Sequence, residues 1–134
     1  SVTVFSDPVR AYAEYFRVLS PGGVLYDREI MATKPCVGQM REEIFATFGV
    51  NRLPERDEWM AALLGAGFRD VQLWISGKLA DACQWYTQVP DMLQRADDNL
   101  FDDQSIRDMV RLYDDTMSKH ADYLGYGVWM AGRP

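Results

Sequence analysis

Positive charge is scarce in this sequence. Its 134 residues include 14 lysines and arginines against 20 acidic residues, which gives a formal net charge of -6. Nucleic-acid binding and docking on an anionic membrane both need clustered basic side chains, so this balance disfavours both functions. No apolar run approaches the roughly 20 residues that cross a bilayer. With 48% hydrophobic residues, the chain has the composition of one globular domain, residues 1–134.

Cysteine and histidine are scarcer still. Cys36 and Cys83 stand far apart and match no metal-ligand spacing. Two buried thiols in a reducing cytoplasm are the favoured interpretation, with a disulfide or redox role as the alternative. His120, the only histidine, is interpreted as a solvated residue near a helix end, with a general base as the alternative. We therefore expect a cytoplasmic protein.

One acidic run, RADDNLFDDQ, concentrates carboxylates in the second half of the chain. Oxygen ligands of this kind suit magnesium. Solvated carboxylates that end one helix and begin the next are the favoured interpretation, so no metal site is expected. The carboxylates concerned are Asp97, Asp98, Asp102 and Asp103.

Helix and strand signals alternate along the chain. Asp7-Pro8 begins a helix, because Asp caps free N–H groups and Pro suits the first turn. Pro21-Gly22-Gly23 ends that helix, and Gly67 followed by Phe68 ends a later one, whose buried stripe is expected to be Trp59, Met60, Leu63 and Leu64. Helical and alternating spacing of apolar residues predicts helices near 8–19, 39–48, 55–66, 78–86, just after 90 and 103–121, and strands near 24–30, 71–76 and 126–131.

This order of elements predicts an α/β fold. Helices that connect successive strands imply a largely parallel sheet covered on both faces. Three strands are few for such a sheet, and the first would leave an exposed edge that calls for a partner. Residues 77–122 form a helical insert before the last strand, and covering a substrate is its expected role.

Three segments carry a resemblance to a known family. They are VTVFSDPVRAYAEYFRVLSPGGVLYDREI, LPERDEWMAALLGAGFRDVQLW and YGVWMAGRP. Together they resemble the C-terminal half of a class I S-adenosylmethionine-dependent methyltransferase, in the small-molecule group called type 11 that includes the ubiquinone-biosynthesis methyltransferases. The resemblance covers about residues 2–31, 53–74 and 123–134, and it leaves the insert unmatched.

The resemblance implies a partial Rossmann-like sheet of the family's fifth to seventh strands, with the last strand antiparallel between the other two. The family binds S-adenosylmethionine with a glycine-rich loop after its first strand, and no G-x-G-x-G follows a strand here. The chain alone is therefore expected to bind the cofactor weakly and to be inactive. Thr3 and Phe5 match a segment that faces the methyl donor and are the expected cofactor contacts, with loop packing as the alternative.

Charged residues near the end of the first strand are the main candidates for substrate binding. In an open α/β sheet, ligands bind beyond the carboxyl ends of the parallel strands. We expect Asp27, Arg28, Glu29 and Met31 at that end, and Trp74 at the end of the next strand. A carboxylate in this place could accept a substrate proton. The alternative is a salt bridge in which Arg28 neutralises its acidic neighbours.

The insert carries aromatic and methionine side chains that would suit an apolar or planar small molecule. Tyr86 and Tyr113 are predicted substrate contacts. Plain core packing is the alternative for these two and for Trp85, Met92, Met109, Met117 and Tyr123.

Two functions are compatible with the sequence. The first is the C-terminal portion of a methyltransferase that acts on a small molecule, in which catalysis depends mainly on positioning the two reactants. The second is a non-catalytic half-fold module for binding or dimerisation, with a homodimer formed through the exposed sheet edge. A strand–GxGxG–helix encoded upstream of Ser1 favours the first function, and a start codon just before Ser1 favours the second.

Overall fold

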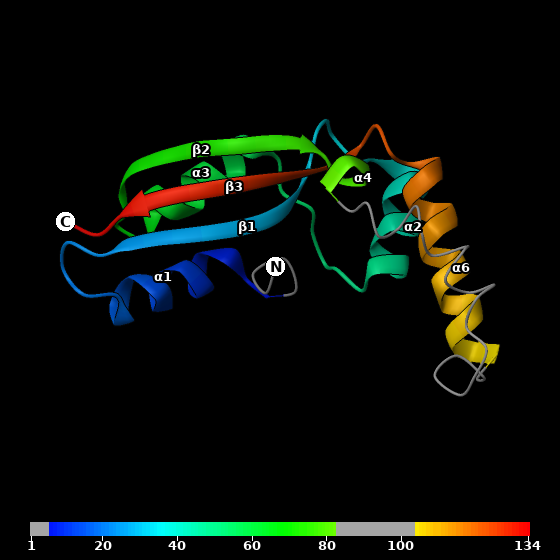
Figure 1. The fold of residues 1–134 in the computed structure, drawn as a ribbon, viewed down its shortest axis with the longest axis horizontal. Helices are drawn as coiled ribbons and strands as arrows, with labels where there is room; N and C mark the ends of the chain where they lie inside the picture. The colour runs from blue at the N-terminus through cyan, green and yellow to red at the C-terminus, as the bar shows by residue number, and fades with distance from the viewer. Residues whose placement is uncertain (1–5, 83–103) are drawn as a thin grey trace.

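The chain folds into helices packed on and beside a three-stranded sheet (Figure 1). The computed structural model describes residues 6–82 and 104–134. In chain order, the elements are α1 (Pro8–Val18), β1 (Val24–Ala32), α2 (Gly38–Phe48), α3 (Arg56–Gly65), β2 (Arg69–Lys78), α4 (Leu79–Ala82), α6 (Gln104–Lys119) and β3 (Leu124–Gly132).

The strands lie in the order β1-β3-β2. β3 pairs antiparallel with both neighbours, so that Met130 lies opposite Tyr26 on one side and Gln72 on the other. This confirms the expected place of the last strand, antiparallel between the other two. The expectation of a largely parallel sheet is wrong for the described residues. β1 and β2 run in the same direction, but the reversed strand separates them.

α1 and α3 cover one face of the sheet. Tyr12 of α1 and the α3 residues Trp59 and Leu63 are buried against Met31 of β1 and Trp129 of β3. The rings of Tyr12 and Trp59 meet edge to face, with their centroids 6.0 Å apart. Removing these large side chains from water is the main stabilising term for this half of the molecule.

Both ends of α1 are held by polar contacts. At the N-terminus, Asp7 Oδ1 accepts a hydrogen bond from the backbone N–H of Val9 at 3.0 Å, and Pro8 occupies the first turn, as predicted. At the C-terminus, the Arg133 guanidinium donates to the carbonyls of Phe16 and Leu19. The last carbonyls of a helix lack partners within it, so Arg133 ties the end of α1 to the end of the sheet.

The end of α3 also follows the sequence prediction. Gly67 has a φ of +106°, a conformation that favours glycine, and Phe68 after it is fully buried. The predicted buried stripe of α3 is only partly right. Trp59 and Leu63, one helical turn apart, face the core, whereas Leu64 lies about 100° further round the helix and is 44% exposed.

A second apolar cluster lies at the end of the sheet where β1 and β2 stop (Figure 1). Ile44 of α2, Leu79 of α4, Met117 of α6 and Leu124 of β3 are buried together there. α2 and α6 therefore stand beyond the strand ends and not over a sheet face. Within residues 6–82 and 104–134, no helix has the length and apolar character needed to cross a membrane.

Candidate functional site

Three segments of the chain meet at the carboxyl end of β1. The backbone N–H of Ala32 donates to the carbonyl of Pro54 at 2.9 Å, and Ala32 forms a parallel bridge with Glu55. The N–H of Thr33 donates to the carbonyl of Tyr123 at 3.0 Å. The loop before α3 and the turn before β3 are thus fastened to the strand end beyond which ligands bind in α/β sheets.

A cavity of about 350 Å³ opens beside this strand end. It lies between the loop after β1, α2 and the connection from α2 to α3, and its volume suits a small molecule. Its walls include Cys36, Arg41, Phe45, Asn51, Arg52 and Glu55. We call it the β1-end cavity.

Charged groups of both signs border the β1-end cavity. Arg52 Nη2 lies 3.4 Å from Glu58 Oε1, and Glu58 Oε2 accepts a hydrogen bond from the backbone N–H of Glu55 at 2.8 Å. The Arg41 guanidinium lies 5.2 Å from the centre of the Phe45 ring. Burial, and secondly the Glu55 carboxylate, raise the pKa of the Cys36 thiol. The cavity therefore holds a protonated thiol, which is a poor nucleophile.

The acidic residues predicted to contact substrate lie inside β1 and not beyond it, because the strand continues to residue 32. The Tyr12 hydroxyl donates to Asp27 Oδ2 at 2.8 Å, and Glu29 is 1% exposed. Burial, and then the charges of Asp27 and Glu29, raise the pKa of Tyr15. Both carboxylates therefore belong to the interface between β1 and α1.

The other predicted contacts on the sheet are divided between its two faces. Met31 lies in the core beneath α1 and α3. Arg28 lies on the opposite face, with its guanidinium 5.4 Å from the centre of the Tyr126 ring. Trp74 lies where the register of β2 shifts against β3, is 60% exposed and meets the Tyr26 ring edge-on at 6.2 Å. Side chains alternate along a strand, so these residues do not form one cluster.

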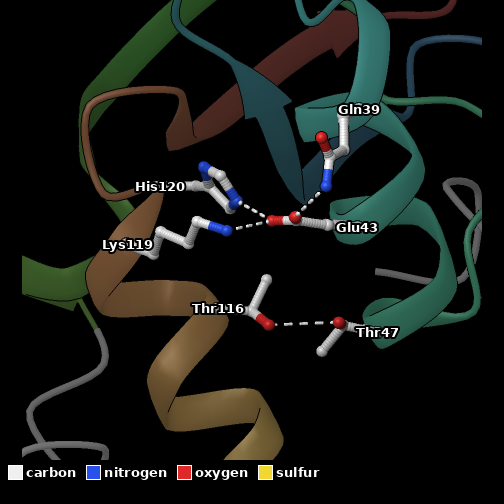
Figure 2. A network of polar contacts seen from close by, with 6 residues as sticks. All are labelled: Gln39, Glu43, Thr47, Thr116, Lys119 and His120. Atoms are coloured by element: carbon white, nitrogen blue, oxygen red, sulfur yellow. Dashed lines mark hydrogen bonds and ion pairs between the residues drawn. The ribbon is translucent and has the colours of Figure 1, made fainter.

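A polar network around Glu43 joins α2 to α6 (Figure 2). Glu43 Oε2 lies 2.6 Å from Lys119 Nζ and 2.8 Å from His120 Nε2, and the Gln39 amide donates to its other oxygen at 3.3 Å. The hydrogen bonds from Lys119 and His120 lower the pKa of Glu43. The interpretation of His120 as a solvated residue is wrong. Its side chain is 8% exposed, because the turn after α6 places it against α2.

A second contact joins the same two helices. The hydroxyl groups of Thr47 and Thr116 lie 3.1 Å apart (Figure 2), and Tyr113 meets the Phe48 ring edge-on at 5.1 Å. A cavity of about 420 Å³ lies between the helices, with Leu112 and Lys119 in its wall. Tyr113, a predicted substrate contact, thus lies at the interface between α2 and α6.

Part of the predicted site lies outside the described residues: Thr3, Phe5, Tyr86, Cys83 and the acidic run 97–103. Within the described part of the chain, no three acidic, cysteine or histidine side chains are grouped so as to hold a metal ion.

The sequence prediction missed Arg41 and Arg52. The two arginines come from different segments, and no motif marks them. The one useful signal was Leu53-Pro54-Glu55, which predicts a helix start. The residues just before that helix lie at the end of β1, because Ala32 pairs with Pro54 and Glu55.

Comparisons with known proteins concern the fold. No protein-family model and no curated protein matches the sequence. Among solved structures, phosphoethanolamine N-methyltransferase 2 of Haemonchus contortus, in complex with S-adenosyl-L-methionine, is similar over 100% of this chain, with a TM-score of 0.76 and 13% identity. The geranyl diphosphate C-methyltransferase of Streptomyces coelicolor A3(2) is similar over 98%, with a TM-score of 0.62 and 14% identity. The [4+2]-cyclase SpnF is similar over 100%, with a TM-score of 0.69 and 23% identity.

At these identities the likeness shows a shared fold. The chain spans 31%, 42% and 48% of the lengths of these three solved chains, in the order given. The chain therefore has the α/β fold of one part of these methyltransferases and of the cyclase.

Proposed function

We propose that this chain is the C-terminal portion of an S-adenosylmethionine-dependent methyltransferase of the type 11 group that acts on a small molecule. The observation that carries the proposal is the sheet. Its order β1-β3-β2, with the middle strand reversed, occurs in a chain of which 100% and 98% match parts of two methyltransferases. The covered shares of those enzymes, 31% and 42%, agree with a portion of such a protein.

The proposed cofactor of the intact enzyme is S-adenosylmethionine. The solved structure of the phosphoethanolamine N-methyltransferase holds S-adenosyl-L-methionine, and that of the geranyl diphosphate C-methyltransferase holds S-adenosyl-L-homocysteine. The described residues do not form a site for this group by themselves. Gly22 and Gly67, both with positive φ, belong to a turn and a helix end, and the sequence has no strand–GxGxG–helix segment. Residues outside this chain would hold most of the cofactor, with Thr3 and Phe5 as contacts from this one.

In this proposal the chain supplies the substrate side of the active site. The β1-end cavity binds the substrate. The insert 77–122, which contains α4 and α6, is the proposed substrate cover, and α6 packs on the Glu43–Thr47 side of α2, away from Arg41 and Phe45 of the cavity wall. Methyl transfer from a sulfonium depends mainly on holding donor and acceptor in line. The proposal therefore needs no general base from Asp27, Glu29 or His120, which lie outside the cavity wall: Asp27 accepts from Tyr12, Glu29 is buried in β1, and His120 is engaged with Glu43.

A non-catalytic module for binding or dimerisation is the second candidate. The observation that favours it is the sheet face away from α1 and α3, where Tyr26 and Trp74 are 59% and 60% exposed. Sheets in α/β domains have both faces covered, so a second copy of the chain or the rest of a methyltransferase would cover this one. A [4+2]-cyclase shares the fold, so the fold by itself does not specify methyl transfer.

Calorimetric titration with S-adenosylmethionine separates the two candidates. The titration compares the 134-residue chain with the product of the whole reading frame that encodes it. The methyltransferase proposal predicts no measurable binding by the chain alone, and binding by the longer product. A reading frame limited to these residues, whose product is a stable dimer that Trp74→Lys dissociates, would support the module.

A further inference from the structure

The β1-end cavity has more hydrogen-bond donors than its own acceptors use. Arg41 forms an ion pair with Glu42 at 4.0 Å, and these side chains are 53% and 78% exposed. That distance is too long for a hydrogen bond. The guanidinium is instead held by its position over the Phe45 ring. Its N–H groups are thus available to a ligand in the cavity.

Arg52, which also lines the cavity, is only partly engaged. Among the residues that the structure describes, its contact with a carboxylate is the 3.4 Å approach of Nη2 to Glu58 Oε1, which is long for a charge-assisted hydrogen bond. An arginine side chain carries several N–H donors in a planar fork. Most of the Arg52 fork is therefore also available.

The two carboxylates in the cavity wall are directed to backbone groups. Glu58 accepts from the N–H of Glu55, and the Glu55 side chain accepts from the N–H of Glu58, which together form the capping box of α3. Negative side chains at this position also interact favourably with the helix dipole. The carboxylates of Glu55 and Glu58 thus accept hydrogen bonds from backbone N–H groups. The guanidinium groups of Arg41 and Arg52 keep N–H donors that can bind a ligand.

We propose that the β1-end cavity binds the anionic head of a small molecule, a phosphate or carboxylate group held between Arg41 and Arg52. Planar guanidinium forks match the oxygens of both anions. Phe45 and Leu53 in the wall supply an apolar surface for the rest of the ligand. The role of this group as the head of the methyl-accepting substrate rests on the proposed function. The anion site itself does not.

Titration with phenyl phosphate tests the assignment, because this probe carries both an anionic head and an apolar ring. The experiment follows binding to the 134-residue chain by calorimetry at low ionic strength, without S-adenosylmethionine. Inorganic phosphate serves as the probe without an apolar body. The variants are Arg41→Gln and Arg52→Gln. Arg111→Gln, on α6, is the control, because it removes the same charge from an exposed arginine outside the cavity wall.

The expected result is saturable binding of phenyl phosphate, tighter than that of inorganic phosphate. Each cavity variant should weaken it about tenfold, as for the loss of a charge-assisted hydrogen bond, and Arg111→Gln should leave it unchanged. Thermal unfolding of each variant verifies the fold. Absence of saturable binding would overturn the proposal. Equal weakening by Arg111→Gln would also overturn it, because it would show that the phosphate is attracted by exposed positive charge in general and not by the cavity. Equal affinity for phenyl phosphate and inorganic phosphate would contradict the part of the proposal in which Phe45 and Leu53 bind the apolar body of the ligand.

The proposed function and this inference fail in different experiments. A longer reading-frame product that binds S-adenosylmethionine and transfers methyl groups, while the chain shows no anion binding, would contradict only the anion site. Arginine-dependent anion binding by a chain whose longer product neither binds S-adenosylmethionine nor transfers methyl groups would contradict only the methyltransferase proposal.

Discussion

His120 Nε2 lies 2.8 Å from Glu43 Oε2, and this contact joins the residue after α6 to the middle of α2. The same oxygen receives Lys119 Nζ at 2.6 Å. One carboxylate thus links the insert helix to the helix that carries Arg41 and Phe45 of the β1-end cavity. The network is a polar connection between the proposed substrate cover and the proposed substrate site.

Removing the Glu43 charge should loosen α6. Glu43→Gln keeps the size of the side chain but replaces one carboxylate oxygen with a group that cannot accept from Lys119 and His120. We expect faster amide hydrogen exchange in α6 and unchanged exchange in the strands. Glu42→Gln, with the same charge change on an exposed neighbour, is the control. Equal exchange in both variants would show that the Glu43 charge does not hold α6 in place.

The same contact predicts a pH dependence of stability. Hydrogen bonds from Lys119 and His120 lower the folded-state pKa of Glu43 below its ordinary value of 4.5. A lowered pKa gives stability that is present above the unfolded-state value and is lost as pH falls through the folded-state value. The difference in Tm between the native chain and Glu43→Gln should thus shrink as the pH falls below 4.5 and through the folded-state pKa of Glu43. A difference that grows on acidification would contradict the assignment.

Tyr12→Phe should destabilise the chain by about 1–2 kcal/mol, because it removes a hydrogen-bond donor to a part-buried carboxylate. The hydroxyl lies 2.8 Å from Asp27 Oδ2, beneath α1. Urea denaturation measures the change. Tyr26→Phe removes the hydroxyl of an exposed tyrosine on β1 and should change stability by less than about 0.5 kcal/mol. Equal effects would mean that the buried bond contributes nothing specific.

Gly67→Ala should cost more than Gly38→Ala, although both glycines have positive φ. A Cβ at Gly67 would lie 3.0 Å from Phe16 Cζ, whereas a Cβ at Gly38 would meet nothing within 4 Å. Backbone strain alone predicts about 1–2 kcal/mol at Gly38. Strain together with overpacking predicts roughly 3 kcal/mol at Gly67. Equal losses in urea denaturation would show that the Phe16 ring moves aside freely.

Local chemistry explains which elements the sequence predicts well. Asp7-Pro8 and Gly67-Phe68 mark helix ends because capping and positive φ are properties of a few adjacent residues. The alternation of Tyr126, Val128 and Met130 likewise predicts β3, and the family resemblance predicts its place between the other strands, which the structure confirms.

The site depends on contacts between distant segments, which local patterns do not specify. β1 extends past its charged residues because Tyr12 and the α1 interface accommodate Asp27 and Glu29. His120 is buried because Glu43, far away in the chain, accepts from it. The β1-end cavity joins the loop after β1, α2 and the start of α3, so no single stretch shows that Arg41 and Arg52 face the same space.

Methyl transfer is the most direct test of the central claim. The product of the whole reading frame around this sequence would be incubated with S-adenosylmethionine labelled in its methyl group and with small-molecule extracts, beside the 134-residue chain alone. The account predicts labelled small-molecule product from the longer polypeptide and none from the chain alone. A longer polypeptide that transfers no label and does not bind S-adenosylmethionine would contradict it.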